Sequence, residues 1–250
     1  MGKLYVVSTP IGNLEDITFR AKRILLEAEI IACEDTRKTG ILLKKLKEIQ
    51  PPSGLSFRFK PKLISYYEEN EIEKIPKIIK FLKEGKNVVL ISSSGTPTIS
   101  DPGFKLVKEC IKQKIEIEAI PGPSAVLTSL VSSGLPTNRF LFLGYLPKKK
   151  NKRQKLLKNV LKIYELIRPT IIFFESPHRL LKTLKEIEEI FGQIEIVVCR
   201  ELTKVYEEIK REKIPLIISH FEKNPPKGEF TILFNILQGL KDRQEEDQAL

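Results

Sequence analysis

The sequence has few of the residues on which metalloenzymes and catalytic-triad enzymes depend. It contains two histidines, His178 and His220, which stand far apart along the chain. Histidine is the commonest metal ligand and the proton carrier of a Ser-His-Asp triad, so there is little material for either site. The three cysteines form no Cys-x-x-Cys pair and lie beside apolar runs, which predicts reduced, mostly buried thiols at Cys33, Cys110 and Cys199. We expect no metal in the active site.

Other absences concern cofactors and membranes. The sequence contains no Gly-x-Gly, so the dinucleotide fingerprint is missing, as is a Walker A loop. No uninterrupted apolar run approaches the roughly 20 residues that a membrane helix needs. The start of the chain, MGKLYVVSTP, lacks the basic and then apolar pattern of a secretory signal. We therefore expect a cytoplasmic protein that binds any nucleotide-like cofactor through another arrangement of loops.

Positive charge is abundant. The chain has 43 Lys and Arg against 32 Asp and Glu, a formal charge of +11, which favours a polyanionic partner such as nucleic acid or an anionic membrane. The alternative is a proteome that is lysine-rich throughout. The densest basic run, PKKKNKRQK, spans 147–155 and follows Phe140, Phe142 and Tyr145. Basic charge beside aromatic rings suits single-stranded nucleic acid, although a solvated basic linker would have the same composition.

Apolar runs of strand length alternate with helical patterns along most of the chain. This alternation predicts an α/β fold whose sheet is mostly parallel and covered on both faces. The expected strands are Leu4–Val7, Glu29–Cys33, Leu63–Tyr66, Val88–Ile91, Ile115–Ile120, Arg139–Leu143, Thr170–Phe174, Ile194–Cys199 and Phe230–Ile236. The expected helices are one that opens at Asp16, Thr39–Lys47, one capped by Asn70, Phe104–Lys112, one from Ser124, Lys152–Ile167 and Pro177–Ile190.

The pattern resets near Gly134-Leu135-Pro136. We therefore predict an N-terminal α/β domain over 1–136 and a smaller C-terminal α/β domain over 137–238. Residues 239–250 are polar enough to predict a disordered tail. The segment QPPSGLSFRFKPK, at 50–62, is predicted to be a proline-rich surface insertion.

Three turns of small residues follow predicted strands. They are STPIGNL at 8–14, SSSGTPTISDPG at 92–103 and PGPS at 121–124. Small residues let a backbone approach a ligand closely, and the carboxyl ends of parallel strands are where open α/β sheets bind ligands. Each turn alone is compatible with an ordinary strand-to-helix connection. Together they predict a ligand cleft.

Charged residues follow three other strands, in EDTR at 34–37, ESPHR at 175–179 and RELTK at 200–204. Repeated charge at strand ends indicates a polar site. For each acidic residue the alternative is a helix N-terminus, where a carboxylate satisfies unpaired N–H groups.

In chain order, the motifs LYVVSTPIGNLEDIT, CEDTRKTG, ISYYEENE, LISSSGTPTISDPG, IPGPSA, FFESPHRL, CRELTK and KGEFT resemble those of one family, the 16S rRNA (cytidine-2′-O)-methyltransferase I family. It belongs to the tetrapyrrole-methylase-like superfamily, and the resemblance runs from Leu4 to about Ile236. It implies a two-domain α/β fold with S-adenosylmethionine in the cleft between the domains. It also implies a homodimer that acts on the small ribosomal subunit, methylating a cytidine ribose 2′-hydroxyl in the decoding region of 16S rRNA, with no membrane or DNA partner.

The resemblance and the motifs together give the candidate site. Cofactor-binding candidates are Pro10, Gly12, Ser92, Ser93, Ser94, Gly95, Thr96, Pro97, Pro121, Ser124, Ala125, Phe174, Glu175, Leu202, Gly228 and Glu229. A general base would help a ribose hydroxyl to react, and the candidates, among which the sequence does not choose, are Glu34, Asp35, Glu175 and Glu201. Predicted RNA contacts are Arg37, Lys148, Lys149, Lys150, Lys152, Arg153, Arg179, Arg200 and Lys204.

The chain departs from the family pattern in three places. Ser93 stands where an aspartate is usual, which bears on cofactor affinity, and Tyr67, Glu68 and Glu69 replace two histidines around a glutamate. The 50–62 insertion is longer than the usual connection. Two alternative functions stay open, a methylase of a small tetrapyrrole and a non-catalytic rRNA-binding module. Titration with S-adenosylmethionine distinguishes the non-catalytic module, which would not bind the cofactor, from the rRNA methyltransferase and the tetrapyrrole methylase.

Overall fold

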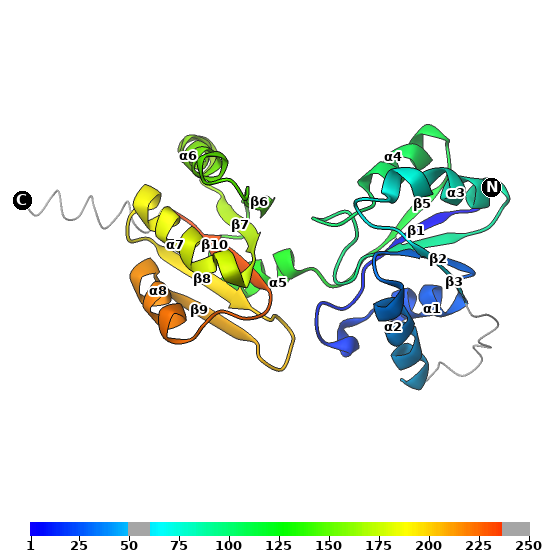
Figure 1. Cartoon of the computed structure of the whole chain (residues 1–250), viewed down its shortest axis with the longest axis horizontal. Coiled ribbons are helices and arrows are strands. Elements are labelled where there is room, and N and C mark those ends of the chain that lie inside the picture. Colours follow the sequence, from blue (N-terminus) through cyan, green and yellow to red (C-terminus); the bar gives the residue numbers. More distant parts are fainter. Residues whose placement is uncertain (50–60, 237–250) are drawn as a thin grey trace, which may run out of the picture. The chain divides into compact units, whose positions relative to one another are not determined.

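The computed structural model describes residues 1–49 and 61–236 (Figure 1). Most of the predicted insertion and the whole predicted 239–250 tail lie outside these residues. The chain divides into two compact units, Met1–Ser124 and Ala125–Leu250. Each unit has its own sheet and its own core.

The first unit is built on a five-stranded parallel sheet, in the order β3-β2-β4-β1-β5. Its strands are β1 Leu4–Val7, β2 Ile30–Cys33, β3 Lys62–Ser65, β4 Val88–Ile91 and β5 Ile117–Ile120. The five strands expected in this half of the chain all form, with ends shifted by a residue or two. The central strands β2 and β4 are buried at every position, as expected for a parallel sheet covered on both faces.

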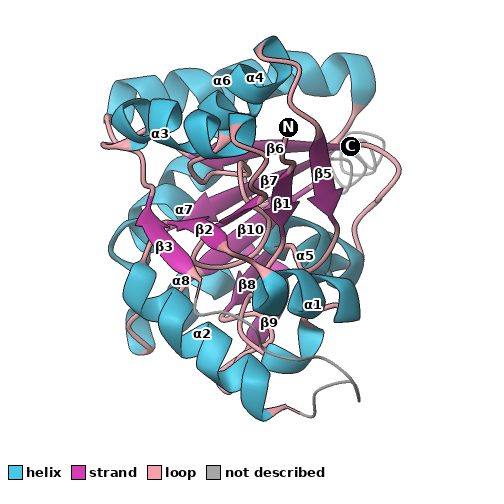
Figure 2. Ribbon diagram, turned by 90° about the vertical axis from the view of Figure 1, so that its right-hand side faces the viewer, coloured by secondary structure: helices cyan, strands magenta, loops and turns pink. Residues whose placement is uncertain are grey.

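Helices cover the two faces of this sheet and divide its core in two. Figure 2 shows α3 (Glu71–Lys83) and α4 (Phe104–Lys112) on one face, with α1 (Phe19–Glu27) and α2 (Thr36–Glu48) on the other. Side chains alternate along a strand, so Val88 and Leu90 pack toward α3 and α4, whereas Val89 and Ile91 pack toward α1 and α2.

The start of α1 corrects the sequence prediction. Asp16 ends a short 3₁₀ turn, η1 (Leu14–Asp16), and does not open the helix. Instead the Thr18 hydroxyl accepts a hydrogen bond from the Ala21 N–H at 3.1 Å, which is the N-cap interaction. Threonine and aspartate are both good N-cap residues, and the sequence alone does not say which of them is used.

The second unit has a mixed sheet in the order β6-β7-β10-β8-β9. Its strands are β6 Phe140–Tyr145, β7 Thr170–Glu175, β8 Glu195–Arg200, β9 Glu208–Lys213 and β10 Phe230–Phe234. β6 and β7 are parallel, whereas β10 runs antiparallel to both of its neighbours, β7 and β8, and β9 is antiparallel to β8. The predicted α/β class with a mostly parallel sheet in the N-terminal domain is confirmed.

Within its described residues, 125–236, four helices accompany this sheet: α5 Ala125–Ser133, α6 Lys150–Ile167, α7 Pro177–Phe191 and α8 Ile214–Lys223. Helices α6, α7 and α8 share one core with the sheet, in which Phe173, Phe191 and Phe234 pack ring against ring. Helix α5 packs on β10 and β7. The division into units therefore falls before α5, whereas the sequence places its reset after that helix.

Membrane-spanning helices and metal clusters are both missing from the described part of the chain. None of the helices within the described residues is long and apolar enough to cross a membrane. Within 1–49 and 61–236, no group of three or more His, Cys, Asp or Glu side chains is arranged to hold a metal ion.

Candidate active site

Hydrogen bonds tie together three loops at the carboxyl ends of β1, β4 and β5. Thr9 and Gly95 form a two-way backbone bridge with N···O distances of 2.9 and 3.1 Å. The Thr96 hydroxyl lies 3.0 Å from the Ser8 hydroxyl and donates to the Pro123 carbonyl oxygen at 3.2 Å. These loops carry the predicted cofactor residues of the first unit, which are Pro10, Gly12, Ser92, Ser93, Ser94, Gly95, Thr96, Pro97, Pro121 and Ser124.

Two features suit the joined loops to a polar ligand that approaches the backbone. A Cβ atom at Gly122 would lie 2.9 Å from the Cβ of Ser8, so the two chain segments meet only because Gly122 has no side chain. Thr9 is 1% exposed, and its Oγ1 is a buried polar atom with no hydrogen-bond partner among the described residues. Leaving such an atom unpaired is costly, and a ligand that bonds to this hydroxyl would remove the cost.

A polar hollow of about 440 Å³ lies at the ends of β2, β3 and β4. Glu34, Arg37, Tyr67, Glu69 and Ser93 are among the residues that line it. The Ser93 N–H donates to Glu34 Oε2 at 3.3 Å. Two of the departures from the family pattern therefore lie at one hollow, together with two candidate bases, Glu34 and Asp35, and one predicted RNA contact, Arg37.

Asp35, the second candidate base, forms the N-cap of α2. Its Oδ1 accepts hydrogen bonds from the N–H groups of Lys38, at 3.1 Å, and Arg37, at 2.8 Å. These two backbone bonds hold the pKa of Asp35 below its ordinary value. A carboxylate that is both engaged and less basic is a poor proton acceptor, so the structure favours the capping interpretation for Asp35.

Glu175, the third candidate base, is buried and fully engaged. It is 1% exposed. Its Oε1 accepts from the Ser176 N–H at 2.8 Å and pairs with Arg179 Nε at 3.3 Å, while its Oε2 accepts from the Thr183 hydroxyl at 2.6 Å. These contacts are those of a carboxylate that holds the start of α7 and orients Arg179.

Glu201, the fourth candidate base, lies in a charged cluster after β8. Its Oε1 accepts from the Glu229 N–H at 2.8 Å and from Lys204 Nζ at 3.0 Å, and Lys204 also pairs with Glu229 Oε2 at 2.8 Å. Burial raises the pKa of Glu201, but these two donors outweigh it and hold the pKa below its usual range. A Cβ atom at Gly228, where φ is +92°, would lie 2.5 Å from the Glu201 carboxylate.

The charged cluster borders a second hollow, of about 320 Å³, lined by Arg200, Glu201, Tyr206, Lys227 and Gly228. Arg200 donates to the Lys227 carbonyl oxygen at 2.8 Å. This hollow therefore gathers Gly228 and Glu201, with Glu229 and Lys204 bonded to Glu201 beside it. Leu202, another predicted cofactor residue, is buried.

The structure corrects the prediction that Arg153 binds RNA. Arg153 is 2% exposed and forms a two-point ion pair with Glu186, with N···O distances of 2.7 and 2.6 Å. Its Nη1 donates to the carbonyl oxygens of Pro147 and Lys148, at 2.9 and 3.0 Å. Every nitrogen of the guanidinium is thus bonded inside the protein, and none is available to a phosphate.

Arg179 has a similar internal role. Its Nη2 donates to the carbonyl oxygen of Leu146 at 2.7 Å, and its Nε pairs with Glu175. By contrast, the predicted RNA contacts Arg37, Lys148, Lys149, Lys150 and Lys152 are exposed. The basic run of 147–155 therefore presents its lysines to solvent and its arginine to the core.

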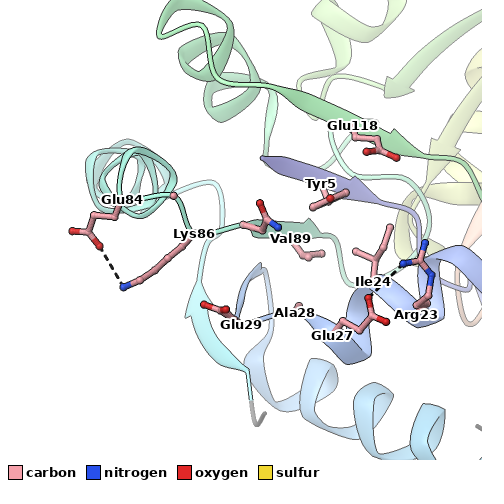
Figure 3. Close-up of a pocket in the computed structure, with 12 residues that line it drawn as sticks. Tyr5, Arg23, Ile24, Glu27, Ala28, Glu29, Glu84, Lys86, Val89 and Glu118 are labelled. Atoms are coloured by element: carbon pink, nitrogen blue, oxygen red, sulfur yellow. Dashed lines mark hydrogen bonds and ion pairs between the residues drawn. The ribbon is translucent and has the colours of Figure 1, made fainter. Parts of the chain in front are cut away.

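A further hollow of about 390 Å³ opens at the amino ends of the first unit's strands (Figure 3). It is lined by Tyr5, Ile24 and Val89 with charged side chains around them. Two of these charges pair locally, Arg23 with Glu27 at 3.4 Å and Lys86 with Glu84 at 3.3 Å. No predicted site residue lines this hollow, so it plays no part in the candidate site.

Sequence reasoning missed Ser8 and Thr9 as site residues. It identified the turn that they begin but chose only Pro10 and Gly12 from it. The available signal was a pair of hydroxyl residues directly after a buried apolar strand, at the sheet edge where ligands bind.

Comparison with known proteins identifies the chain's relatives. A family model described as Tetrapyrrole (Corrin/Porphyrin) Methylases matches residues 3–217. Ribosomal RNA small subunit methyltransferase I of Thermotoga maritima is 46% identical over 235 residues, covering 94% of this chain and 99% of that protein. The protein of the same name from Hydrogenobaculum sp. is 45% identical, over 93% of this chain and 95% of the relative.

Solved structures share the fold at low identity. A diphthine synthase matches with a TM-score of 0.68 and 13% identity, covering 94% of this chain and 90% of that one. Uroporphyrin-III C-methyl transferase from Thermus thermophilus, complexed with S-adenyl homocysteine, matches with a TM-score of 0.61 and 15% identity over 95% and 99% of the two chains. The resemblance seen in the motifs is confirmed, and the chain belongs to the ribosomal RNA small subunit methyltransferase I family, within the tetrapyrrole methylases.

Proposed function

We propose that this protein transfers a methyl group from S-adenosylmethionine to a cytidine ribose 2′-hydroxyl in the decoding region of 16S rRNA. The observation that carries the proposal is its 40–46% identity, over nearly the full chain, to relatives named ribosomal RNA small subunit methyltransferase I. Two structural features support the proposal: the joined loops of β1, β4 and β5 in the first unit, and the exposed lysines of the basic run in the second.

The joined loops of β1, β4 and β5 fit the methyl donor. Thr9 offers a buried hydroxyl with no partner among the described residues, and Gly122 keeps the loops free of side chains. The residues that would hold S-adenosylmethionine are therefore Thr9 and Gly122 together with Gly95 and Thr96. When bound, the cofactor supplies an electrophilic methyl group on a sulfonium centre.

Glu34 is the base that the contacts favour. A protonated ribose hydroxyl is a poor nucleophile, and a positioned base contributes roughly 10²–10⁴-fold to such a step. Asp35 caps a helix, Glu175 is buried with both oxygens bonded, and Glu201 is held by two donors. Glu34 borders the 440 Å³ hollow, and among the described residues the Ser93 N–H is the one group bonded to its carboxylate.

The RNA contacts in this proposal are exposed cations. Arg37 lines the hollow beside Glu34, and Lys148, Lys149, Lys150 and Lys152 surround the start of α6. Such groups bind phosphates and position the RNA without reading its sequence. The choice of nucleotide then depends on how the assembled small subunit presents its decoding region.

A homodimer and a cytoplasmic location belong to the same proposal. The apolar side chains of Leu127 and Val131 on α5 are 52% and 75% exposed, and a second copy is one partner that would cover them. Light scattering of the purified protein at micromolar concentration tests this part separately from the activity.

A transfer assay with S-adenosylmethionine labelled in the methyl group tests the activity. The acceptors are small ribosomal subunits that lack the modification, naked 16S rRNA and a free tetrapyrrole. We expect label in the subunits. Label in the tetrapyrrole alone would identify the sister activity, and binding of RNA without any cofactor binding would identify a non-catalytic module.

A further inference from the structure

Three aromatic rings gather on one face of β6 and β7. The ring of Phe174 lies between those of Phe142 and Tyr145, with centroid distances of 5.0 and 5.6 Å. Tyr145 is 56% exposed, and Phe140, on the same strand, is 44% exposed. Single exposed apolar side chains are ordinary, whereas apolar side chains that gather into one patch commonly mark a contact site.

A bulge in β6 creates this cluster. Phe142 pairs with Ile172 and Tyr145 pairs with Phe174, so three steps along β6 match two along β7. Gly144 lies inside this shift with φ of +63°, a conformation that suits glycine. In a regular strand, Tyr145 would point to the opposite face from Phe142, because it is three residues further on and side chains alternate along a strand; the bulge returns it to the face of Phe142. Bulges commonly re-aim side chains beside functional sites.

The clustered rings face away from the helical core of the second unit. Leu141 and Leu143, which alternate with Phe142 along β6, pack against that core together with the buried Leu146. The rings of Phe142, Tyr145 and Phe174 are therefore not needed to fill the core. We call these three side chains the aromatic face.

The loop that follows the aromatic face is fixed in place by two arginines. Arg179 bonds the carbonyl oxygen of Leu146, and Arg153 bonds those of Pro147 and Lys148. Lys148, Lys149 and Lys150 come directly after Tyr145-Leu146-Pro147 and are exposed. The first turn of α6 contains no acidic residue, although helix N-termini favour negative charge. The lysines thus form a fixed cationic edge that has no acidic partner in the helix's own first turn.

We propose that the aromatic face is a stacking platform for the bases of single-stranded RNA, with Lys148–Lys150 binding the phosphates of the same strand. Unstacked bases stack on aromatic side chains, while a basic groove follows the backbone. The proposal rests on the proposed function, because the strand it would hold is the rRNA segment next to the nucleotide to be methylated. It is separate from the joined loops of β1, β4 and β5 and from Glu34, and it assigns Phe174, a residue that the sequence predicted to bind the cofactor, to the RNA instead.

The test uses a short single-stranded RNA with one central 2-aminopurine, whose fluorescence falls when the base stacks. The chain has no tryptophan, so the probe is excited with little protein background. Tyr145→Leu and the double variant Phe142→Leu/Tyr145→Leu keep an apolar surface but remove the rings. Phe19→Leu is the matched control, because Phe19 is 92% exposed and lies on α1 in the first unit. Melting temperature and S-adenosylmethionine affinity are measured on every variant.

We expect the parent and Phe19→Leu to quench the probe. Because stacking contributes about 1–3 kcal/mol per base, Tyr145→Leu should bind the RNA about tenfold more weakly and quench less. The dependence of its binding on salt should stay unchanged. Replacing Lys148, Lys149 and Lys150 with glutamine should have the opposite effect, changing the salt dependence and not the stacking. It should flatten the salt dependence by about 0.7 log-log units for each phosphate that the protein no longer binds, with quenching intact at saturating RNA.

Two results would overturn the platform. One is a ring variant that binds and quenches like the parent, and the other is a ring variant that loses S-adenosylmethionine binding while keeping RNA binding. The parallel transfer assay separates this inference from the proposed function. A parent that methylates subunits while its ring variants bind RNA normally refutes the platform alone. A parent that stacks RNA but transfers no methyl group supports the platform and refutes the enzyme.

Discussion

Replacing Arg153 with methionine tests whether this side chain supports the basic run from inside the protein. Arg153 and Glu186 are 2% and 3% exposed and share two hydrogen bonds. The hydrogen bonds that Arg153 donates to the Glu186 carboxylate outweigh burial and raise the pKa of the guanidinium. Methionine matches much of the side chain's volume but leaves the Glu186 carboxylate buried without its cation.

The expected loss of stability is large. Removing one partner of a buried ion pair costs about 3–5 kcal/mol, which for a unit of this size lowers the melting temperature by roughly 10–20 °C. Lys152→Met is the matched control, because Lys152 is the exposed neighbour on the same helical turn. It should leave the melting temperature unchanged and reduce the salt dependence of RNA binding.

A double variant tests the buried Arg153–Glu186 pair even if Arg153→Met folds poorly. Arg153→Met combined with Glu186→Leu removes both charges, and replacing a whole buried pair by apolar side chains is often neutral. The double variant should regain most of the stability. If Arg153→Met melts like the parent and instead weakens RNA binding as Lys152→Met does, Arg153 is a surface contact and the buried pair is misassigned.

Three further predictions follow from the sites. Thr9→Val removes a hydroxyl that has no described partner, so the melting temperature should hold while calorimetry shows S-adenosylmethionine bound roughly five- to tenfold more weakly; equal affinity would remove Thr9 from the cofactor site. Glu34→Gln should lower methyl transfer at least tenfold at unchanged stability, whereas Glu48→Gln, on the exposed end of α2, should transfer at the parent rate; a fully active Glu34→Gln places the base elsewhere. Burial raises the pKa of all three thiols, to about 11 and about 12 in two of them, so a thiol reagent at pH 8 should label them only after unfolding, and rapid native labelling would contradict the buried positions of Cys33, Cys110 and Cys199.

The first unit was largely predictable from the sequence. Its strands are short runs such as Val88–Ile91 that are apolar at every position, and its helices show the 3.6-residue period between them. The second unit was less predictable. Its strand β10 lies between β7 and β8, and no local sequence pattern determines the order of strands in a sheet. The strand Glu208–Lys213 was missed because its sequence, EIKREK, is charged and lies at the sheet edge.

The candidate site was predictable in its loops and less so in its charges. Asp35 and Glu34 are neighbours of equal chemistry that line the same hollow, and only the structure shows that Asp35 caps α2 whereas Glu34 does not. Arg153 was misassigned because the run PKKKNKRQK was interpreted by composition alone. Its spacing to Leu157, Val160 and Tyr164 marks the buried side of α6, and this helical period was available in the sequence.

The nucleoside produced by the reaction tests the central claim most directly. Small ribosomal subunits that lack the modification are incubated with the protein and S-adenosylmethionine, and the 16S rRNA is then digested to nucleosides and analysed by mass spectrometry. We predict one new modified nucleoside, 2′-O-methylcytidine, whose fragments carry the methyl group on the sugar. A methyl group on the base, or no methylated nucleoside from subunits that the protein demonstrably binds, would contradict the account.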